Sequence, residues 1–272
     1  SNTQGDIGSS AIPVNINLSG ALRQAGAASD MYLSHSGGDL YLGAVSAGDT
    51  LSIFNNNDLF AYDSDSFISA DEFILDVNSH DIGSSSDAID INMSGNSGLN
   101  IDAGNAWLNV IDTSLFTLAN IDVNNTFNLV TPAALDIQGD ISANDMVLNA
   151  QGNITSGSRF NITADNSLDI DASSIDLDDI TVNAGTANVY AQAGSLTVDE
   201  MTITNSDLTL LANGQTNLLG TIWVQSGSML GDASSIIMDA AASIRSYVNM
   251  TLTATDTLTL YNLSASNGTI DL

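Results

Sequence analysis

The sequence of 272 residues carries 32 acidic and three basic side chains, which gives a formal net charge of −29 at pH 7, while 43% of its residues are hydrophobic. Hydrophobic content this high excludes a disordered acidic tail, and the near-absence of Lys and Arg excludes nucleic acid and anionic membrane surfaces as partners, because phosphate binding needs these cations. The sequence has no cysteine, and no apolar run approaches the roughly 18 residues of a membrane-spanning helix.

Residues 1–30 differ from the rest and are predicted to form an N-terminal cap or leader segment. Residues 11–18 (AIPVNINL) favour one strand, and residues 21–29 (ALRQAGAAS) are alanine-rich enough for a short helix or a small cap. A cover of this kind is expected at the end of a repetitive sheet, because an open strand edge invites aggregation. The start of the chain lacks the basic and apolar regions of a signal peptide, and its repeats continue to Leu272. The chain is therefore expected to be intracellular, already processed, or a piece cut from a longer polypeptide, and the repeats that reach the last residue favour a piece.

A pattern of coils occupies residues 31–272 and is irregular up to about residue 105. Residues 31–50 and 51–72 predict coils of 20 and 22 residues, and residues 80–88 predict a loop. Further apolar runs predict strands at uneven spacing, namely 73–77, 89–93 and 99–103.

Regular coils follow over residues 106–272, where a seven-residue phrase recurs about every 20 residues. Its third residue is aliphatic in seven of eight coils, and its fifth is alanine in the last six. Such a period with alternating apolar residues is typical of a solenoid. The third-position column is Leu108, Leu129, Leu148, Ile170, Val189, Leu210, Gly231 and Leu252. The alanine column is Ala150, Ala172, Ala191, Ala212, Ala233 and Ala254.

Each regular coil is expected to hold about three short strands, as in 187–191, 196–198 and 201–203. Gly, Asn, Ser and Asp between such strands turn corners rather than form hairpins, which would alternate in direction and would not stack like on like. The sequence therefore predicts an all-β fold, a right-handed parallel β-helix (β-solenoid) of about 11 coils of roughly 20–21 residues.

The columns also predict which side chains face inward. The third position packs in the core, and the fifth lies at a corner with room only for a methyl group. The second and fourth positions face outward, and neither places two Asp in successive coils. Like charges stacked about 5 Å apart would repel by somewhat under 1 kcal/mol in water, so this face avoids charge ladders.

Segments such as LNAQGNITSGSRFNITADNSLDIDASSIDLDDITVNAG (148–185) resemble the haemagglutinin-type repeats of filamentous haemagglutinin and related large adhesins. The resemblance covers 106–272 and, more loosely, 31–105. It implies a β-helical shaft, export through the outer membrane of a Gram-negative bacterium by two-partner secretion, and a role in adhesion or aggregation. The Asn-Pro-Asn-Gly turn of the secretion domain is missing from the sequence, so the resemblance implies shaft and not secretion domain.

Catalysis is not expected. Asp178 and Asp179 form a carboxylate pair of the kind that pectin-degrading β-helix hydrolases use, but those enzymes also need a histidine and a basic subsite. The two histidines, His35 and His80, lie several coils away, and Arg159 is the one basic residue in the central part of the sequence. We therefore predict no enzyme, with no catalytic and no cofactor-binding residues.

Calcium is the cofactor left open, because Asp-rich turns supply the six to eight oxygen ligands that this ion takes. Neither the EF-hand pattern nor the glycine-rich nonapeptide occurs, and the alternative is a diffuse counter-ion atmosphere. The two candidate clusters are Asp63, Asp65, Asp71 and Glu72, and Asp176, Asp178 and Asp179.

Two other parts of the sequence have residue types that occur in binding surfaces. The threonine-rich run 251–260 would suit ice, but the preceding coil offers no matching threonine rank. Four aromatic residues would suit sugar stacking, although core filling or coil-end packing is the expected role of each. They are Trp107, Tyr190, Trp223 and Tyr247.

The sequence thus predicts a structural or adhesive shaft segment of a large secreted or cell-surface bacterial protein, acting in adhesion, aggregation or filament formation. The alternatives are a glycan-binding or carbohydrate-active β-helix and a phage tail-fibre segment. Expected partners are a receptor or glycan on a host or neighbouring cell, or further copies of the chain, with no nucleic acid and no membrane insertion. The expected location is extracellular, on the outer surface of a Gram-negative bacterium.

Overall fold

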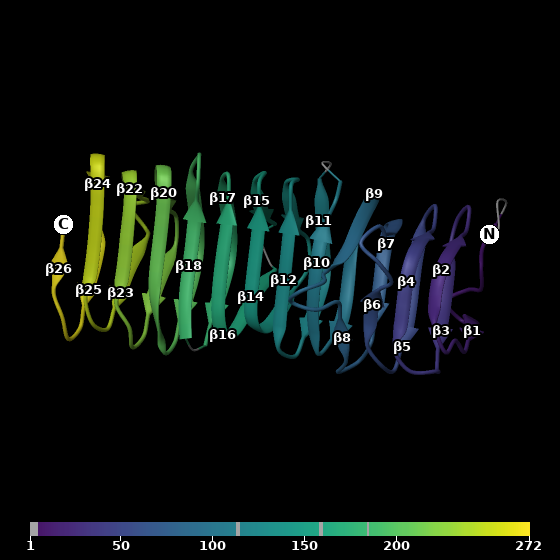
Figure 1. Ribbon diagram of the computed structural model, residues 1–272. Coiled ribbons are helices and arrows are strands. Elements are labelled where there is room, and N and C mark those ends of the chain that lie inside the picture. Colours follow the sequence, from purple (N-terminus) through teal and green to yellow (C-terminus); the bar gives the residue numbers. More distant parts are fainter. Residues whose placement is uncertain (1–4, 113–114, 158–159, 184) are drawn as a thin grey trace. The chain divides into compact units, whose positions relative to one another are not determined.

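The computed structural model describes residues 5–112, 115–157, 160–183 and 185–272. Within these ranges the chain forms strands and no helix, and the strands of neighbouring turns pair in parallel. The fold is a β-solenoid of about 12 turns, which confirms the predicted all-β, parallel β-helix. The chain divides into two compact units, residues 1–134 and 135–272, and Figure 1 labels most of their strands.

The first unit holds twelve of the described strands. Odd-numbered strands stack mainly on one face and even-numbered strands mainly on another, but strands of the two sets also pair with each other at two places. The first face carries β1 (Val14–Ile16), β3 (Met31–His35), β5 (Thr50–Asn55), β7 (Ile68–Asp76), β9 (Ile89–Ala103) and β11 (Phe116–Val123). The others are β2 (Ala21–Gly26), β4 (Leu40–Ser46), β6 (Leu59–Ala61), β8 (Asp81–Ile82), β10 (Asn105–Val110) and β12 (Thr126–Thr131). One buried column on the first face is Leu33, Ile53, Leu75, Ile101 and Ile121.

The helix considered for residues 21–29 is wrong. This segment forms β2, which pairs in parallel with β4 and places Leu22 beside Leu42. Alanine favours helices only weakly, and backbone hydrogen bonds to the next turn outweigh that preference here. The solenoid therefore begins inside the first thirty residues, which accounts for about 12 turns where about 11 were expected.

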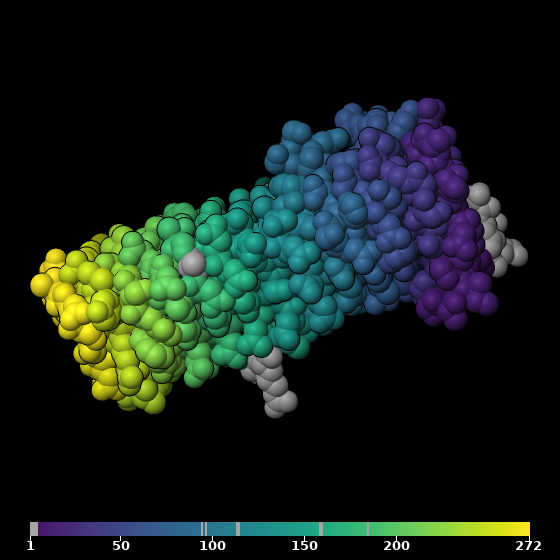
Figure 2. Space-filling view, turned by 90° about the horizontal axis from the view of Figure 1, so that it is seen from below, coloured from purple at the N-terminus to yellow at the C-terminus, as the bar shows by residue number. Residues whose placement is uncertain are grey.

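The second unit has three rows of strands, one for each face of a turn. Its strands are β13 (Leu135–Ile137), β14 (Ile141–Ala150), β15 (Ile154–Ser156), β16 (Asn161–Ala172), β17 (Ile175–Val182), β18 (Gly185–Ala191), β19 (Leu196–Ile203), β20 (Ser206–Leu218), β21 (Thr221–Val224), β22 (Met229–Met238), β23 (Ser243–Ser246), β24 (Met250–Thr259), β25 (Asn262–Ala265) and β26 (Ile270–Asp271). In Figure 2 the colour changes steadily along this unit from teal to yellow, as turns stacked in sequence order require.

The first row contains the predicted columns, and its register confirms them. Leu148, Ile170, Val189, Leu210, Gly231 and Leu252 pair in succession, as do the six alanines from Ala150 to Ala254. Gly231 interrupts the aliphatic column because its neighbours fill the space, since a Cβ there would lie 2.9 Å from Cδ2 of Leu252. In the first unit, Leu108 pairs with Leu129 as predicted.

The second and third rows complete each turn. The predicted strands 196–198 and 201–203 are both present, joined in β19. Residues 196–198 belong to the second row, and residues 201–203 belong to the third row, which continues through β21, β23 and β25. Side chains alternate inward and outward along these strands, so every third-row strand presents its outward residues on one common face.

A candidate ligand-binding groove on the third row of the second unit

The predicted carboxylate pair lies among further carboxylates. The backbone N–H of Asp178 donates to Ser156 Oγ at 3.0 Å, and Asp179 pairs in register with Glu200 of the next turn. Desolvation raises the pKa of Asp199, followed in effect by the charge of Asp178, its hydrogen bond to that side chain, and the charges of Glu200 and Asp179. An acidic ladder thus exists at this corner, although the first row avoids one.

Both histidines belong to the first unit, whereas the carboxylate pair belongs to the second. His35 is buried, with Nδ1 3.0 Å from Asn55 Oδ1 and Nε2 3.2 Å from the carbonyl oxygen of Leu18. His80 is exposed, and its Nδ1 lies 3.5 Å from Asp58 Oδ1. Arg159, the one basic residue in the central part of the sequence, lies outside the described residues.

The acidic candidates for calcium accept local hydrogen bonds. Asp63 Oδ1 accepts from Ser66 Oγ at 2.7 Å and from the backbone of Asp65 at 3.2 Å, which makes a tight turn. Glu72 accepts from Thr50 at 3.2 Å in the neighbouring turn. Across residues 5–112, 115–157, 160–183 and 185–272, no three His, Cys, Asp or Glu side chains are grouped so as to hold a metal ion.

A carboxylate ladder that the sequence did not indicate lies in the first unit. Asp102 pairs in register with Asp76 on one side and with Asp122 on the other. Desolvation raises the pKa of Asp102, and the charges of Asp76 and Asp122 raise it further. The uneven spacing before residue 105 left this register undefined in the sequence.

The four aromatic candidates do not form one surface. Trp107 belongs to the first unit, and Tyr190 lies on the first row between Asp171 and Leu211. Trp223 lies in β21 of the third row, Tyr247 directly follows β23 of the same row, and the two residues are 46% and 45% exposed. Core filling is therefore wrong for these two residues, which face solvent.

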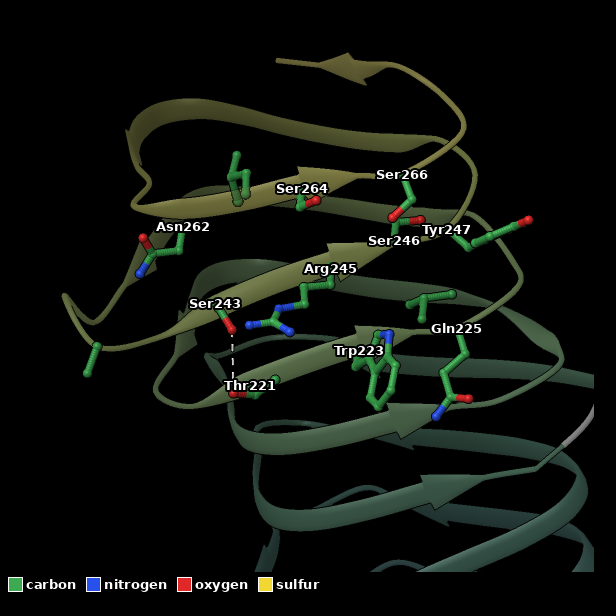
Figure 3. A pocket seen from close by; sticks show the side chains of 13 residues that line it. Thr221, Trp223, Gln225, Ser243, Arg245, Ser246, Tyr247, Asn262, Ser264 and Ser266 are labelled. Atoms are coloured by element: carbon green, nitrogen blue, oxygen red, sulfur yellow. Dashed lines mark hydrogen bonds between the residues drawn. The ribbon is translucent and has the colours of Figure 1, made fainter.

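Trp223 and Tyr247 line a groove of about 930 Å³ on the third row. Strands β21, β23 and β25 form its floor, and the register stacks Trp223, Arg245 and Ser264 on successive turns. Figure 3 shows Arg245 and Trp223 side by side in this groove, with Gln225 and Asn262 beyond them. The full lining is Thr221, Trp223, Val224, Gln225, Ala241, Ser243, Arg245, Ser246, Tyr247, Asn262, Leu263, Ser264 and Ser266.

The groove differs in charge from the rest of the chain. Its lining contains no Asp or Glu, although the sequence has 32 acidic residues. Arg245 is exposed, and its side chain makes no hydrogen bond or ion pair to any residue that the structure describes. The two hydroxyls of Ser243 and Thr221 meet at 3.4 Å along one wall. The sequence predicts the outward direction of Trp223, because this residue stands between the apolar Ile222 and Val224, which are both buried.

Comparison with protein-family models, with curated proteins and with solved structures gives no match. The resemblance to haemagglutinin-type repeats therefore stays a prediction from the sequence. None of the described segments is a helix with the length and apolar character of a membrane span. Fold and groove together define the class of protein, a parallel β-solenoid that carries a groove of aromatic, polar and cationic side chains.

Proposed function

We propose that this chain is a non-enzymatic shaft segment of a large secreted or cell-surface bacterial protein that acts in adhesion, aggregation or filament formation. The observation that carries the proposal is the in-register stacking within the second unit, where the aliphatic and alanine columns continue from turn to turn. In a core of this kind each turn packs only on its neighbours, so the core continues along the stack and does not enclose one central cavity.

The same stacking supports a mechanical role. Each turn is joined to the next by parallel backbone hydrogen bonds on all three rows, for example from β18 to β20, from β17 to β19 and from β21 to β23. Separating two turns along the stack breaks the bonds of three rows together. A segment with this construction resists extension and holds the parts of a protein on either side of it apart.

The absence of enzymatic activity is part of the proposal, and the surroundings of the predicted pair support it. Among the described residues, Asp178 interacts with Asp199, and Asp179 pairs in register with Glu200. Four carboxylates at one corner repel an anionic substrate. The acidic surface suits an extracellular setting, where the proposed partners are a cell-surface receptor or glycan and further copies of the chain.

Beads coated with the purified chain test this proposal. We expect the beads to adhere to bacterial or host cells or to cluster with one another, and we expect no release of reducing ends from a panel of polysaccharides. Release of product would overturn the non-enzymatic role. Beads that neither adhere nor cluster would contradict the adhesive role, because uncoated beads and beads coated with heat-unfolded chain set the background.

Glycan binding is the second candidate function, and the third-row groove favours it. An exposed tryptophan offers a flat apolar face for a sugar ring, and the surrounding amides and hydroxyls offer hydrogen bonds. The groove contains Trp223, Gln225 and Asn262 in this arrangement. Because its lining has no carboxylate, the groove supports binding of a glycan rather than its hydrolysis.

A further inference from the structure

We propose that the third-row groove binds a sugar that bears a carboxylate, with the ring stacked on Trp223 and the carboxylate paired with Arg245. This inference rests on the glycan-binding function proposed above and specifies the ligand by its charge. Three observations carry it: the unpaired Arg245, the acid-free lining, and the strand register that joins Arg245 to Trp223.

Arg245 has an unusual setting for this chain. The sequence has only three basic residues against 32 acidic ones, yet the exposed Arg245 side chain pairs with none of the described carboxylates. A guanidinium group stays protonated at all relevant pH values and presents a planar fork of N–H donors that matches a carboxylate. The groove therefore holds a positive charge whose counter-ion the described part of the protein does not supply.

The lining favours a singly charged group over a polyanion. Arg245 is the only cation among the lining residues, and the formal net charge of −29 repels densely charged ligands. One planar guanidinium suits one planar carboxylate, whereas a heavily sulfated or phosphorylated chain would need several cations. A carboxylated sugar adds the one negative charge that the groove accommodates.

The strand register sets the two contacts at a suitable spacing. Trp223 pairs with Arg245 in the next turn, and neighbouring strands lie about 4.8 Å apart. A pyranose ring that covers the indole of Trp223 thus has its substituents within reach of the guanidinium. Ser264 follows Arg245 on the third turn, and Gln225 and Asn262 lie toward the two ends of the groove in Figure 3. The groove spans three turns and therefore has room for more than one sugar unit.

Titration of tryptophan fluorescence tests the inference directly. The sequence has two tryptophans, so the Trp107→Phe variant of the full chain makes Trp223 the sole reporter. The probes are the methyl glycoside of galacturonate and sialyllactose, each with one carboxylate, and the methyl ester of the first and lactose serve as neutral counterparts. We expect a saturable change with at least one acidic probe and binding at least tenfold weaker for its neutral counterpart.

Arg245→Gln is the matched variant, because glutamine keeps a polar side chain and removes the charge. We expect this substitution to weaken binding of the acidic probe at least tenfold and to leave binding of the neutral probe unchanged. Trp223→Ala should abolish binding of both the acidic and the neutral probe. Calorimetry measures binding to this variant, because the substitution removes the fluorescent reporter. Unchanged circular dichroism and thermal midpoint show that each exposed-site variant folds.

Two results would overturn the inference and are distinguishable from each other. Equal binding of acidic and neutral probes, unaffected by Arg245→Gln, would remove the role of the carboxylate and leave glycan binding in place. Binding of neither kind of probe would overturn both the carboxylate and the glycan-binding function. The bead assay tests the shaft function independently of these binding experiments.

Discussion

Asp102 of β9 lies directly beside Asp122 of β11 in the parallel ladder of the first unit, and Asp76 of β7 flanks it on the other side. Desolvation and these two charges raise the pKa of Asp102 above its ordinary value of 3.8. A carboxyl group with a raised pKa in the folded state contributes stability below its unfolded-state pKa, and this contribution is lost as the pH rises through the folded-state pKa. At neutral pH the ladder therefore works against folding.

Asp102→Asn should accordingly stabilise the chain at pH 7, by no more than about 1 kcal/mol because the group is exposed to solvent. The gain should vanish as the pH falls below about 4, where the carboxyl is protonated in both states. Thermal unfolding of both chains across this pH range measures the difference. Asp39→Asn removes one charge from an exposed turn and controls for net charge. An equal gain from both substitutions would show that the ladder itself has no effect.

Leu210 and Leu211 offer a matched pair for the column assignment, because they are adjacent and differ in direction. Leu210 is 1% exposed in the aliphatic column, and Leu211 lies on the outward face. Leu210→Asn should destabilise the chain by about 3 kcal/mol, since it buries an amide without a partner and removes packed atoms. Leu211→Asn should cost under about 1 kcal/mol. If chemical denaturation showed that both substitutions lower the free energy of unfolding equally, the column assignment would be contradicted.

Thr216 breaks an aliphatic column of the second row, where it pairs with Leu196 and Ile236. Its side chain is 3% exposed, and its Oγ1 has no hydrogen-bond partner among the residues that the structure describes. Thr216→Val replaces this hydroxyl by a methyl group of similar size, so we expect a gain of about 1 kcal/mol. Urea denaturation measures it, and Thr209→Val on the outward face should change stability much less. A loss of stability on Thr216→Val would mean that the hydroxyl has a hydrogen-bond partner in the folded chain.

Deletion of one whole turn should leave a folded chain. Removing residues 187–207 brings Leu208 to the register position of Ala187, next to Leu168, and the alanine column closes across the gap. Removing only residues 187–197 joins strands of different rows and should abolish cooperative unfolding. Circular dichroism and thermal melting distinguish the two products. Loss of structure in both deletions would show that turns are not interchangeable units.

Repetition explains how much of this molecule the sequence predicts. The first-row columns recur in one phrase, so their register and inward direction are readable without coordinates. Residues 21–29 show the limit of local composition, because alanine content favours a helix that the neighbouring turn overrides. The sequence does not predict the ladder of Asp76, Asp102 and Asp122, because the coils before residue 105 have uneven lengths and their strand register cannot be read from a repeat.

The groove was harder to predict than the fold. The sequence marks Trp223 and Tyr247 as candidates for sugar binding. No repeated phrase marks the third row, so the sequence does not show that the two residues lie on one face. Arg245 is one of only three basic residues in the sequence, and nothing in the sequence links it to Trp223, which lies a full turn earlier. Alternation around Trp223 and Arg245 predicts their outward direction; only the register of β21 and β23 places them together.

The pairing of each turn with the one before it also bears on how the chain acquires its structure. In the second unit Ala187 pairs with Leu168, and Leu208 in turn pairs with Ala187, so each partner lies about 20 residues earlier in the sequence. A segment that emerges gradually from a ribosome or a secretion channel finds its template already formed, and the loop to be closed is always short. A turn that follows in the sequence can therefore dock onto the turn before it, so that a solenoid of this kind can form one turn after another.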